Sequence, residues 1–169
     1  ATKVSVGSNH TCSLRAGGSV ACWGNNGAGQ LGNRTVVSQP TPTGVALLTD
    51  AQDISSGISH NCVRRTNDAM QCWGWNAYGQ LGDETFTSRT LRVDVTGLSD
   101  VVQMAVGGFS SCAVLSNGKA VCWGGNSEGQ LGDGTTSTRN STSVTIEVEG
   151  RVSPRAVAPP SICSGLRVD

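Results

Sequence analysis

Short apolar runs, each ended by glycine or another turn-forming residue, follow one another along the whole chain. The first such runs precede a glycine, at Val4–Val6, Ile54–Ser56 and Met104–Val106. Two further runs, Thr11–Leu14 and Val20–Trp23, bracket a glycine turn. Runs of this length that are bounded by turn residues predict β-strands, and a turn between two of them predicts a hairpin.

A fourth apolar run comes late in each repeating unit and predicts a fourth strand. These late runs are Val45–Leu48, Leu91–Val95 and Val144–Val148. The whole pattern repeats with a period of 50 residues, as the spacing of Cys12, Cys62 and Cys112 illustrates. Four short strands per unit of about this length are typical of a β-propeller blade.

The register divides the chain into three whole units and one partial, degenerate unit. We expect blades at 4–53, 54–103 and 104–155, followed by a docking or linker segment at 156–169. The predicted fold is therefore all-β, with propeller-type blades that form an open arc or belong to a closed ring. An arc would leave a sheet face uncovered at each end.

Three long segments share a common core: CWGNNGAGQLG, CWGWNAYGQLG and CWGGNSEGQLG. They resemble the regulator of chromosome condensation repeat, in which a hairpin precedes such a core, and the resemblance extends over nearly the whole chain. It implies a β-propeller. The version with cysteine on both hairpin strands is similar to bacterial secreted or surface members. Relatives in that family include a nucleotide exchange factor for a small GTPase and an inhibitor of β-lactamases.

Six cysteines form pairs with ten-residue spacing across the predicted hairpin turns. Residues opposite each other on hairpin strands lie within reach of a disulfide, whereas structural zinc favours cysteines two to four residues apart. We therefore favour disulfides over reduced thiols or a metal site, and with them an oxidising, secreted or cell-surface location. The predicted pairs are Cys12–Cys22, Cys62–Cys72 and Cys112–Cys122.

Cys163 is the seventh cysteine, and its partner by register would lie beyond Asp169. We expect it to be free, bonded to another chain, or separated from its partner by truncation. An odd cysteine in a secreted protein is a hint of pairing between chains.

Composition and charge narrow the function classes. The 169 residues carry 12 Lys+Arg and 12 Asp+Glu, so the net charge of zero offers no attraction to nucleic acid or to an anionic membrane. No apolar stretch is long enough for a spanning helix. The segment 27–32 formally matches a nucleotide-binding glycine motif, but Ala77 and Ser127 replace its first glycine in the other units, so we expect no cofactor.

Neither catalytic nor metal-binding residues recur in register. His10 and His60 are matched by Ser110 in the third unit, so we interpret them as turn residues bonded to backbone and expect no enzyme activity. Asn33, Asp83 and Asp133 supply one oxygen-bearing side chain per unit. That is too few for calcium, so we expect them to cap turns.

The segments after each Gly-Gln-Leu-Gly differ between units and are expected to form the binding face. The candidate contact residues there are Arg34, Glu84, Phe86, Arg89 and Arg139. Three sequons make candidate glycosylation sites of Asn9, Asn33 and Asn140.

These features favour a non-catalytic, extracellular scaffold that binds a protein partner or further copies of itself, as a head-to-tail oligomer or fibre. A secreted regulator or inhibitor of a partner enzyme is the alternative, and a glycan-binding lectin is less favoured.

Overall fold

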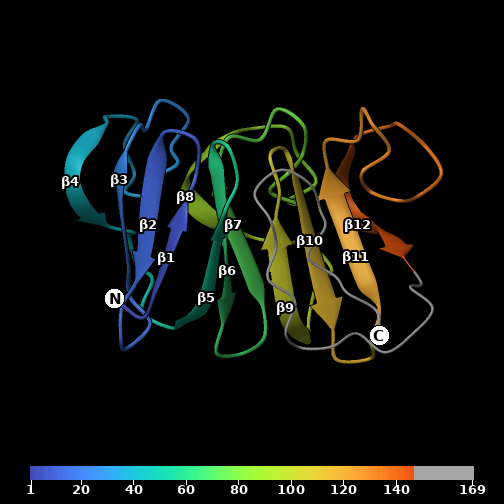
Figure 1. Ribbon diagram of the computed structural model, residues 1–169, viewed down its shortest axis with the longest axis horizontal. Helices are drawn as coiled ribbons and strands as arrows, with labels where there is room; N and C mark the ends of the chain where they lie inside the picture. The colour runs from blue at the N-terminus through green and yellow to red at the C-terminus, as the bar shows by residue number, and fades with distance from the viewer. Residues whose placement is uncertain (147–169) are drawn as a thin grey trace.

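The computed structural model describes residues 1–146, which form three antiparallel sheets of four strands each (Figure 1). Each sheet is a meander in which strands adjacent in sequence pair. The first contains β1 (Lys3–Val6), β2 (His10–Leu14), β3 (Val20–Gly24) and β4 (Gln39–Gly44). The second contains β5 (Ala51–Ser56), β6 (His60–Arg65), β7 (Met70–Gly74) and β8 (Arg89–Asp94). The third contains β9 (Val101–Val106), β10 (Ser110–Leu115), β11 (Ala120–Gly124) and β12 (Arg139–Ile146).

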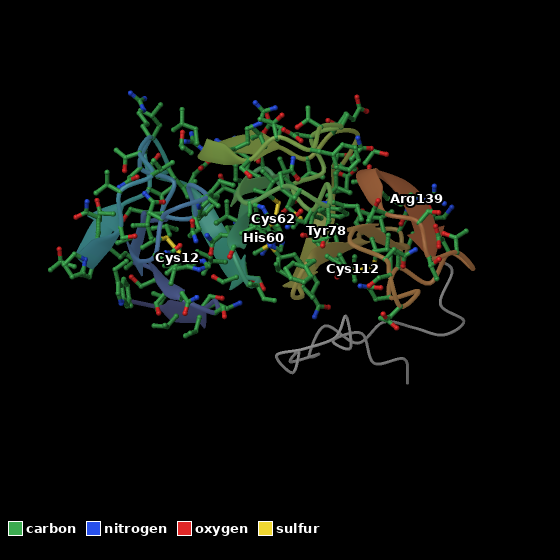
Figure 2. The ribbon with its side chains drawn as sticks, turned by 90° about the horizontal axis from the view of Figure 1, so that it is seen from above. Cys12, His60, Cys62, Tyr78, Cys112 and Arg139 are labelled. Carbon is green, nitrogen blue, oxygen red and sulfur yellow. A yellow bond between two sulfur atoms is a disulfide. The ribbon has the colours of Figure 1, made fainter. Side chains whose placement is uncertain are left out.

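The three sheets stand side by side as blades of an open arc, in the order of the chain (Figure 1). Seen from above, the first strands β1, β5 and β9 follow one side of the arc, and β4, β8 and β12 follow the other (Figure 2). The predicted propeller-type, all-β class is therefore confirmed for the described residues. The partial unit expected at 156–169, and Cys163 with it, lie outside them.

The two middle strands of each blade are joined by a disulfide at directly opposite residues. Cys12 pairs with Cys22 in the β2–β3 register, with a Cα–Cα distance of 4.1 Å. The other two blades repeat this arrangement at Cys62–Cys72 and Cys112–Cys122. All six cysteines are buried, and Figure 2 labels one cysteine of each bridge. The structure thus agrees with the pairing that the ten-residue spacing predicts.

The predicted fourth strand of the first blade was wrong in position. The strand is Gln39–Gly44, whereas Val45–Leu48 forms the connection to the next blade. Pro40 and Pro42 are tolerated in β4 because it is the outer strand of its sheet. Val45 and Leu48 are apolar because they are buried in the core that joins the first two blades. For the third blade, the predicted segment 144–148 overlaps β12, and its last two residues lie outside the described range.

Most of the core lies between the blades. One apolar cluster joins the first blade to Ile54 and Trp73 of the second, and another joins the second blade to Val101 and Trp123 of the third. Ile54 is 0% exposed because the first blade covers it, whereas Val4, one repeat earlier, is 55% exposed. Burial of such side chains supplies the main stacking force.

Side-chain hydrogen bonds add direction to this stacking. The indole Nε1 of Trp73 donates to the carbonyl oxygen of Gln30 at 2.9 Å, and Asn61 Nδ2 donates to the same oxygen at 2.7 Å. The next junction repeats the pattern, with Trp123 and Ser111 donating to Gln80 O. Trp73 and Trp123 therefore pack between blades.

The histidines differ from their prediction in two respects. They begin strands β2 and β6 rather than lying in turns. They were expected to bond to backbone, but His10 Nε2 lies 2.8 Å from Asn61 Oδ1, and His60 Nε2 lies 3.1 Å from Ser111 Oγ. Both partners are side chains of the following blade. The two rings are buried, and each connects residues of neighbouring blades that lie 51 positions apart in the sequence.

In the part of the chain that the structure describes, no helix has the length and apolar character needed to cross a membrane.

Candidate interaction surfaces

The variable loops of all three blades lie along the same edge of the arc, which we call the loop face (top of Figure 1). It comprises the loops 25–38, 75–88 and 125–138, together with the turns 7–9, 57–59 and 107–109. The loops begin where β3, β7 and β11 end, at Gly24, Gly74 and Gly124. They share one edge because these three strands run in the same direction.

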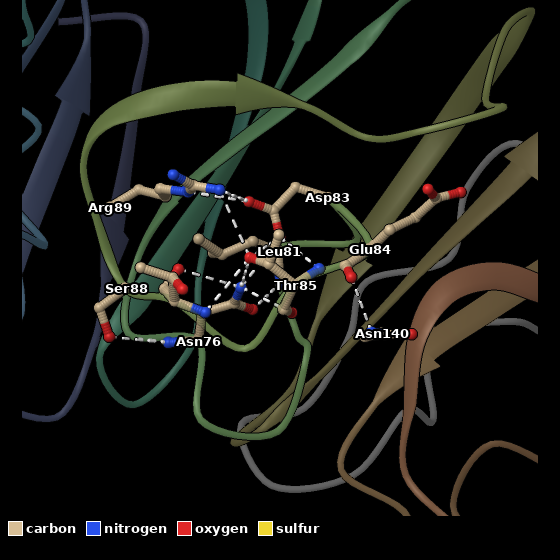
Figure 3. A network of polar contacts seen from close by, with 9 residues as sticks. Asn76, Leu81, Asp83, Glu84, Thr85, Ser88, Arg89 and Asn140 are labelled. Atoms are coloured by element: carbon tan, nitrogen blue, oxygen red, sulfur yellow. Dashed lines mark hydrogen bonds and ion pairs between the residues drawn. The ribbon is translucent and has the colours of Figure 1, made fainter.

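A buried asparagine organises each loop from inside, as Figure 3 shows for Asn76. Its Oδ1 accepts a hydrogen bond from the amide of Leu81 at 2.9 Å. Its Nδ2 donates to Asp83 Oδ1 and to the carbonyl oxygens of Thr85 and Thr87 at 3.0–3.1 Å. Asn26 and Asn126 make the equivalent contacts in their own loops. The loops are therefore folded by their own polar side chains, although their surface residues differ.

Asn33, Asp83 and Asp133 cap turns, which agrees with their sequence interpretation. Asp133 Oδ1 accepts from both the amide and the hydroxyl of Thr135. The hydrogen bond from the Thr135 hydroxyl, followed by the ion pair with Arg139, lowers the pKa of Asp133 to about 2. For Asp83, burial raises the pKa, but hydrogen bonds from Thr85 and Arg89 outweigh it and the net shift is downward.

Two of the candidate contact residues, Arg89 and Arg139, are thus held within their loops. Arg89 Nε donates to Asp83 Oδ2 at 2.8 Å, and both Arg139 Nε and Nη2 donate to Asp133 Oδ2. Each guanidinium group neutralises the capping carboxylate and braces the loop against the start of the following strand. A structural role therefore accounts for both arginines.

Arg34 and Glu84 contact the neighbouring blade through backbone and present their side chains to solvent. Their amides donate to Thr90 O and Asn140 O, at 3.1 and 2.9 Å. Both have positive φ, 69° and 61°, a left-handed conformation that aims the amide across the gap between blades. Phe86, by contrast, is 54% exposed near the tip of its loop.

The three sequons lie in different environments. Asn9 is exposed in a turn of the loop face. Asn33 is partly buried, and its Oδ1 accepts bonds from Thr35. The Nδ2 atom of Asn140, to which a glycan would be attached, donates a hydrogen bond to Glu84 O.

An aromatic cluster on the loop face did not figure among the predicted site residues. Trp75, Tyr78 and Phe109 bring their ring centroids within 5.3–5.4 Å of one another. Tyr78 lies near the centre of the arc in Figure 2. The signal for this cluster was departure from the repeat: Asn25 and Gly125 stand where the middle unit has Trp75.

The outward sheet faces of the first and third blades form a second candidate surface, which we call the terminal faces. On the first blade, Val4 and Val6 are 55% and 67% exposed, and Trp23 is only partly buried. On the third, Gln130 is partly exposed, whereas Gln30 and Gln80 are covered by the following blade. Each terminal face therefore carries one of the two partners that meet at the internal junctions: the tryptophan side on the first blade and the glutamine side on the third.

Within residues 1–146, no three His, Cys, Asp or Glu side chains come together to hold a metal ion. The side chains named on both surfaces offer apolar contact and hydrogen bonding.

Comparison with known proteins agrees with this architecture. A family model of the regulator of chromosome condensation (RCC1) repeat matches residues 1–30, 51–80 and 101–130, and a second with the same description matches 17–64 and 71–114. No curated protein sequence matches the chain.

Solved structures that share the fold include the following two. Human WBSCR16 has a TM-score of 0.76 at 24% sequence identity, and the match covers 89% of this chain and 40% of that protein. The ectodomain of the Physcomitrella patens receptor kinase CR4 has a TM-score of 0.56 at 22% identity, covering 89% of this chain and 33% of that one. The chain thus spans less than half the length of either protein.

The family matches recur with the 50-residue period and coincide with the disulfide hairpins and the Gly-Gln-Leu-Gly turns seen in the structure. The chain belongs to the regulator of chromosome condensation (RCC1) repeat family, in a form whose blades are cross-linked by paired cysteines.

Proposed function

We propose that this chain is a non-catalytic protein-interaction scaffold that works outside the cell and associates with further copies of itself. The observation behind this proposal is that recurring and varying residues occupy different parts of each repeat. Residues that recur in register build the hairpin, the loop clamp and the contacts between blades, whereas residues that vary occupy the exposed loops. Repeat proteins commonly bind partners through such variable loops.

The three disulfides support an extracellular location. Each closes a short hairpin loop and is buried beside the core. Cytosolic thiols are kept reduced, so three cross-links in 169 residues favour an oxidising compartment.

The terminal faces support self-association because each carries the residues that contact the other kind of face at the internal junctions between blades. The first blade offers two exposed valines and the partly exposed Trp23, whose counterparts in later blades pack against a preceding blade. The third blade offers Gln130, whose counterparts accept the bond from the next tryptophan. A second copy placed head to tail would repeat the internal contact, and such contacts form rings or fibres.

Light scattering over a series of protein concentrations tests this association. We expect a mass above the 17.3 kDa of one chain that rises with concentration. Replacing both Val4 and Val6 with Asp should abolish the increase, since charge would be buried in the contact. A matched control, Val36→Asp with Val37→Asp, alters valines that are 57% and 62% exposed on a loop and should leave association unchanged.

A monomer of 17.3 kDa at every concentration would refute self-association. Equal loss of association in the control pair would show that added charge, rather than the terminal face, is responsible.

A further inference from the structure

Three aromatic rings from two blades contact one another on the loop face. Trp75 and Tyr78 belong to the loop after β7, and Phe109 belongs to the turn between β9 and β10. Trp75 meets Tyr78 and Phe109 edge to face, at interplanar angles of 85° and 70°. Tyr78 is 41% exposed, and the neighbouring Ile58 is 39% exposed. We call these four residues the aromatic patch.

The fold itself does not require this patch. The residues in register with Trp75 are Asn25 and Gly125, and those in register with Tyr78 are Ala28 and Glu128. The same loops close with the same asparagine clamp in all three blades. The large rings are therefore additions to the middle of the arc rather than parts of the repeat.

Neighbouring glycines make room for the rings. A Cβ at Gly125 would lie 3.1 Å from Phe109 Cβ, and one at Gly108 would lie 3.3 Å from Ile58 Cδ1. Either contact is tighter than ordinary packing, so the third blade accommodates Phe109 and Ile58 through these missing side chains. Close mutual packing also holds the rings in place before any partner arrives, which reduces the entropy lost on binding.

The backbone beneath the patch already uses its polar groups. The amide of Trp75 donates to Ser59 O, that of Ile58 to Gly108 O, and that of Tyr78 to Gln80 Oε1. These bonds fix the turns that carry the rings. They also leave fewer hydrogen-bond donors pointing outward for a polar ligand.

These properties distinguish between kinds of partner. A sugar needs an exposed flat ring together with hydrogen-bonding groups for its hydroxyls, whereas here the rings are tilted against one another and the nearby amides are engaged. Clustered tryptophan, tyrosine and aliphatic side chains are typical of the centres of protein interfaces. We propose that the aromatic patch is the docking site for a protein partner that packs a large apolar side chain against it. This inference rests on the proposed function as an interaction scaffold.

Selection from a library of random displayed peptides on the immobilised full chain provides the test. We expect enriched peptides to share a large apolar residue, and we would titrate them as synthetic peptides. Three variants borrow the residue found in register in another unit, which keeps the fold compatible: Trp75→Asn, Tyr78→Ala and Phe109→Ser. Each should weaken peptide binding by about tenfold or more, as removal of an interface centre does.

Val102→Ala is the matched control, because it truncates an apolar side chain that is 52% exposed on β9, outside the loop face and outside the patch. It should leave binding within about twofold, as for peripheral contacts. Unfolding midpoints of all four variants would establish that the fold is retained.

Three results would overturn the inference: no enriched peptide, peptides that bind the patch variants as tightly as the original chain, or binding of chitohexaose or cellohexaose that depends on Tyr78 in place of peptide binding. If peptides bind independently of the patch, the inference fails while the scaffold function stands. Self-association through the terminal faces is a separate readout of the scaffold function, and its loss would count against that function rather than against the patch.

Discussion

At the scale of single residues, His10 and His60 are titratable side chains that are buried away from water. His60 is fully buried, and Ser111, its partner, donates its one hydroxyl proton to Gln80 O. Nε2 of His60 must therefore carry the proton that bonds to Ser111 Oγ. Among the described residues, neither histidine Nδ1 has a hydrogen-bond partner, so a second proton there would be buried without an acceptor.

The pKa values of both histidines follow from this. Burial lowers the pKa of His60 to about 3, and the nearby His10 adds to the effect. Burial also lowers the pKa of His10, and the hydrogen bond to Asn61 offsets only part of that change. In the unfolded chain, a histidine titrates near its ordinary pKa of about 6.5.

We therefore predict that acid destabilises the protein before its carboxylates titrate. Between pH 6.5 and 4 the unfolded chain binds protons that the folded chain refuses, so stability falls as pH falls. The slope should reach about 1.4 kcal/mol per pH unit for each fully shifted histidine. Asp133, with its pKa lowered to about 2, contributes stability that is lost only at lower pH.

Urea unfolding at a series of pH values measures this slope. His60→Ser, which copies Ser110 of the third blade, should reduce the slope between pH 6.5 and 4. Its absolute stability is not the criterion, because removing a buried ring also leaves a cavity. An unchanged slope in this variant would contradict the assignment.

At the scale of elements, blades are joined by a contact that recurs at each junction. A tryptophan in the third strand of one blade donates to a glutamine carbonyl of the preceding blade, at 2.9 Å for Trp73 and 3.0 Å for Trp123. Both indoles are 0% exposed, whereas Trp23 at the same place in the first blade is partly exposed. Trp23 therefore serves as an internal control for how much the contact between blades stabilises the protein.

We predict that Trp73→Phe and Trp123→Phe each lower the free energy of unfolding by about 1–3 kcal/mol, since an aromatic ring remains but the hydrogen bond is lost. Trp23→Phe should cost less than about 1 kcal/mol, as is usual at partly exposed sites. Urea denaturation at low protein concentration, where self-association is minimal, measures all three. Equal losses in the three variants would show that the tryptophans stabilise their own blades rather than the junctions.

At the scale of the whole molecule, the disulfides determine how the seven cysteines should react. Six lie in the three bridges, and Cys163 lies outside the described residues. We predict one free thiol per chain in denaturant without reductant, or none if Cys163 bonds to another chain. Thiol titration together with intact mass under non-reducing conditions separates these two results. Seven titratable thiols would contradict the disulfide-linked blades.

The sequence by itself predicted the hairpins, the cysteine pairs, the capping role of Asp83 and Asp133, and the propeller-type class. Each of these depends on residues close together in one unit, and the 50-residue repeat displays each of them three times. The fourth strand of the first blade was misplaced because the apolar residues of Val45–Leu48 serve the contact between blades rather than a strand.

Only the tertiary structure decided which residues meet across units. His10 bonds to Asn61, 51 residues away, and Trp73 bonds to Gln30, 43 residues away. The aromatic patch likewise exists because stacking brings the loop of Trp75 and Tyr78 beside the turn of Phe109. A repeat pattern reports what each unit needs in order to fold, whereas contacts between units depend on the distance and twist at which one sheet stacks on the next.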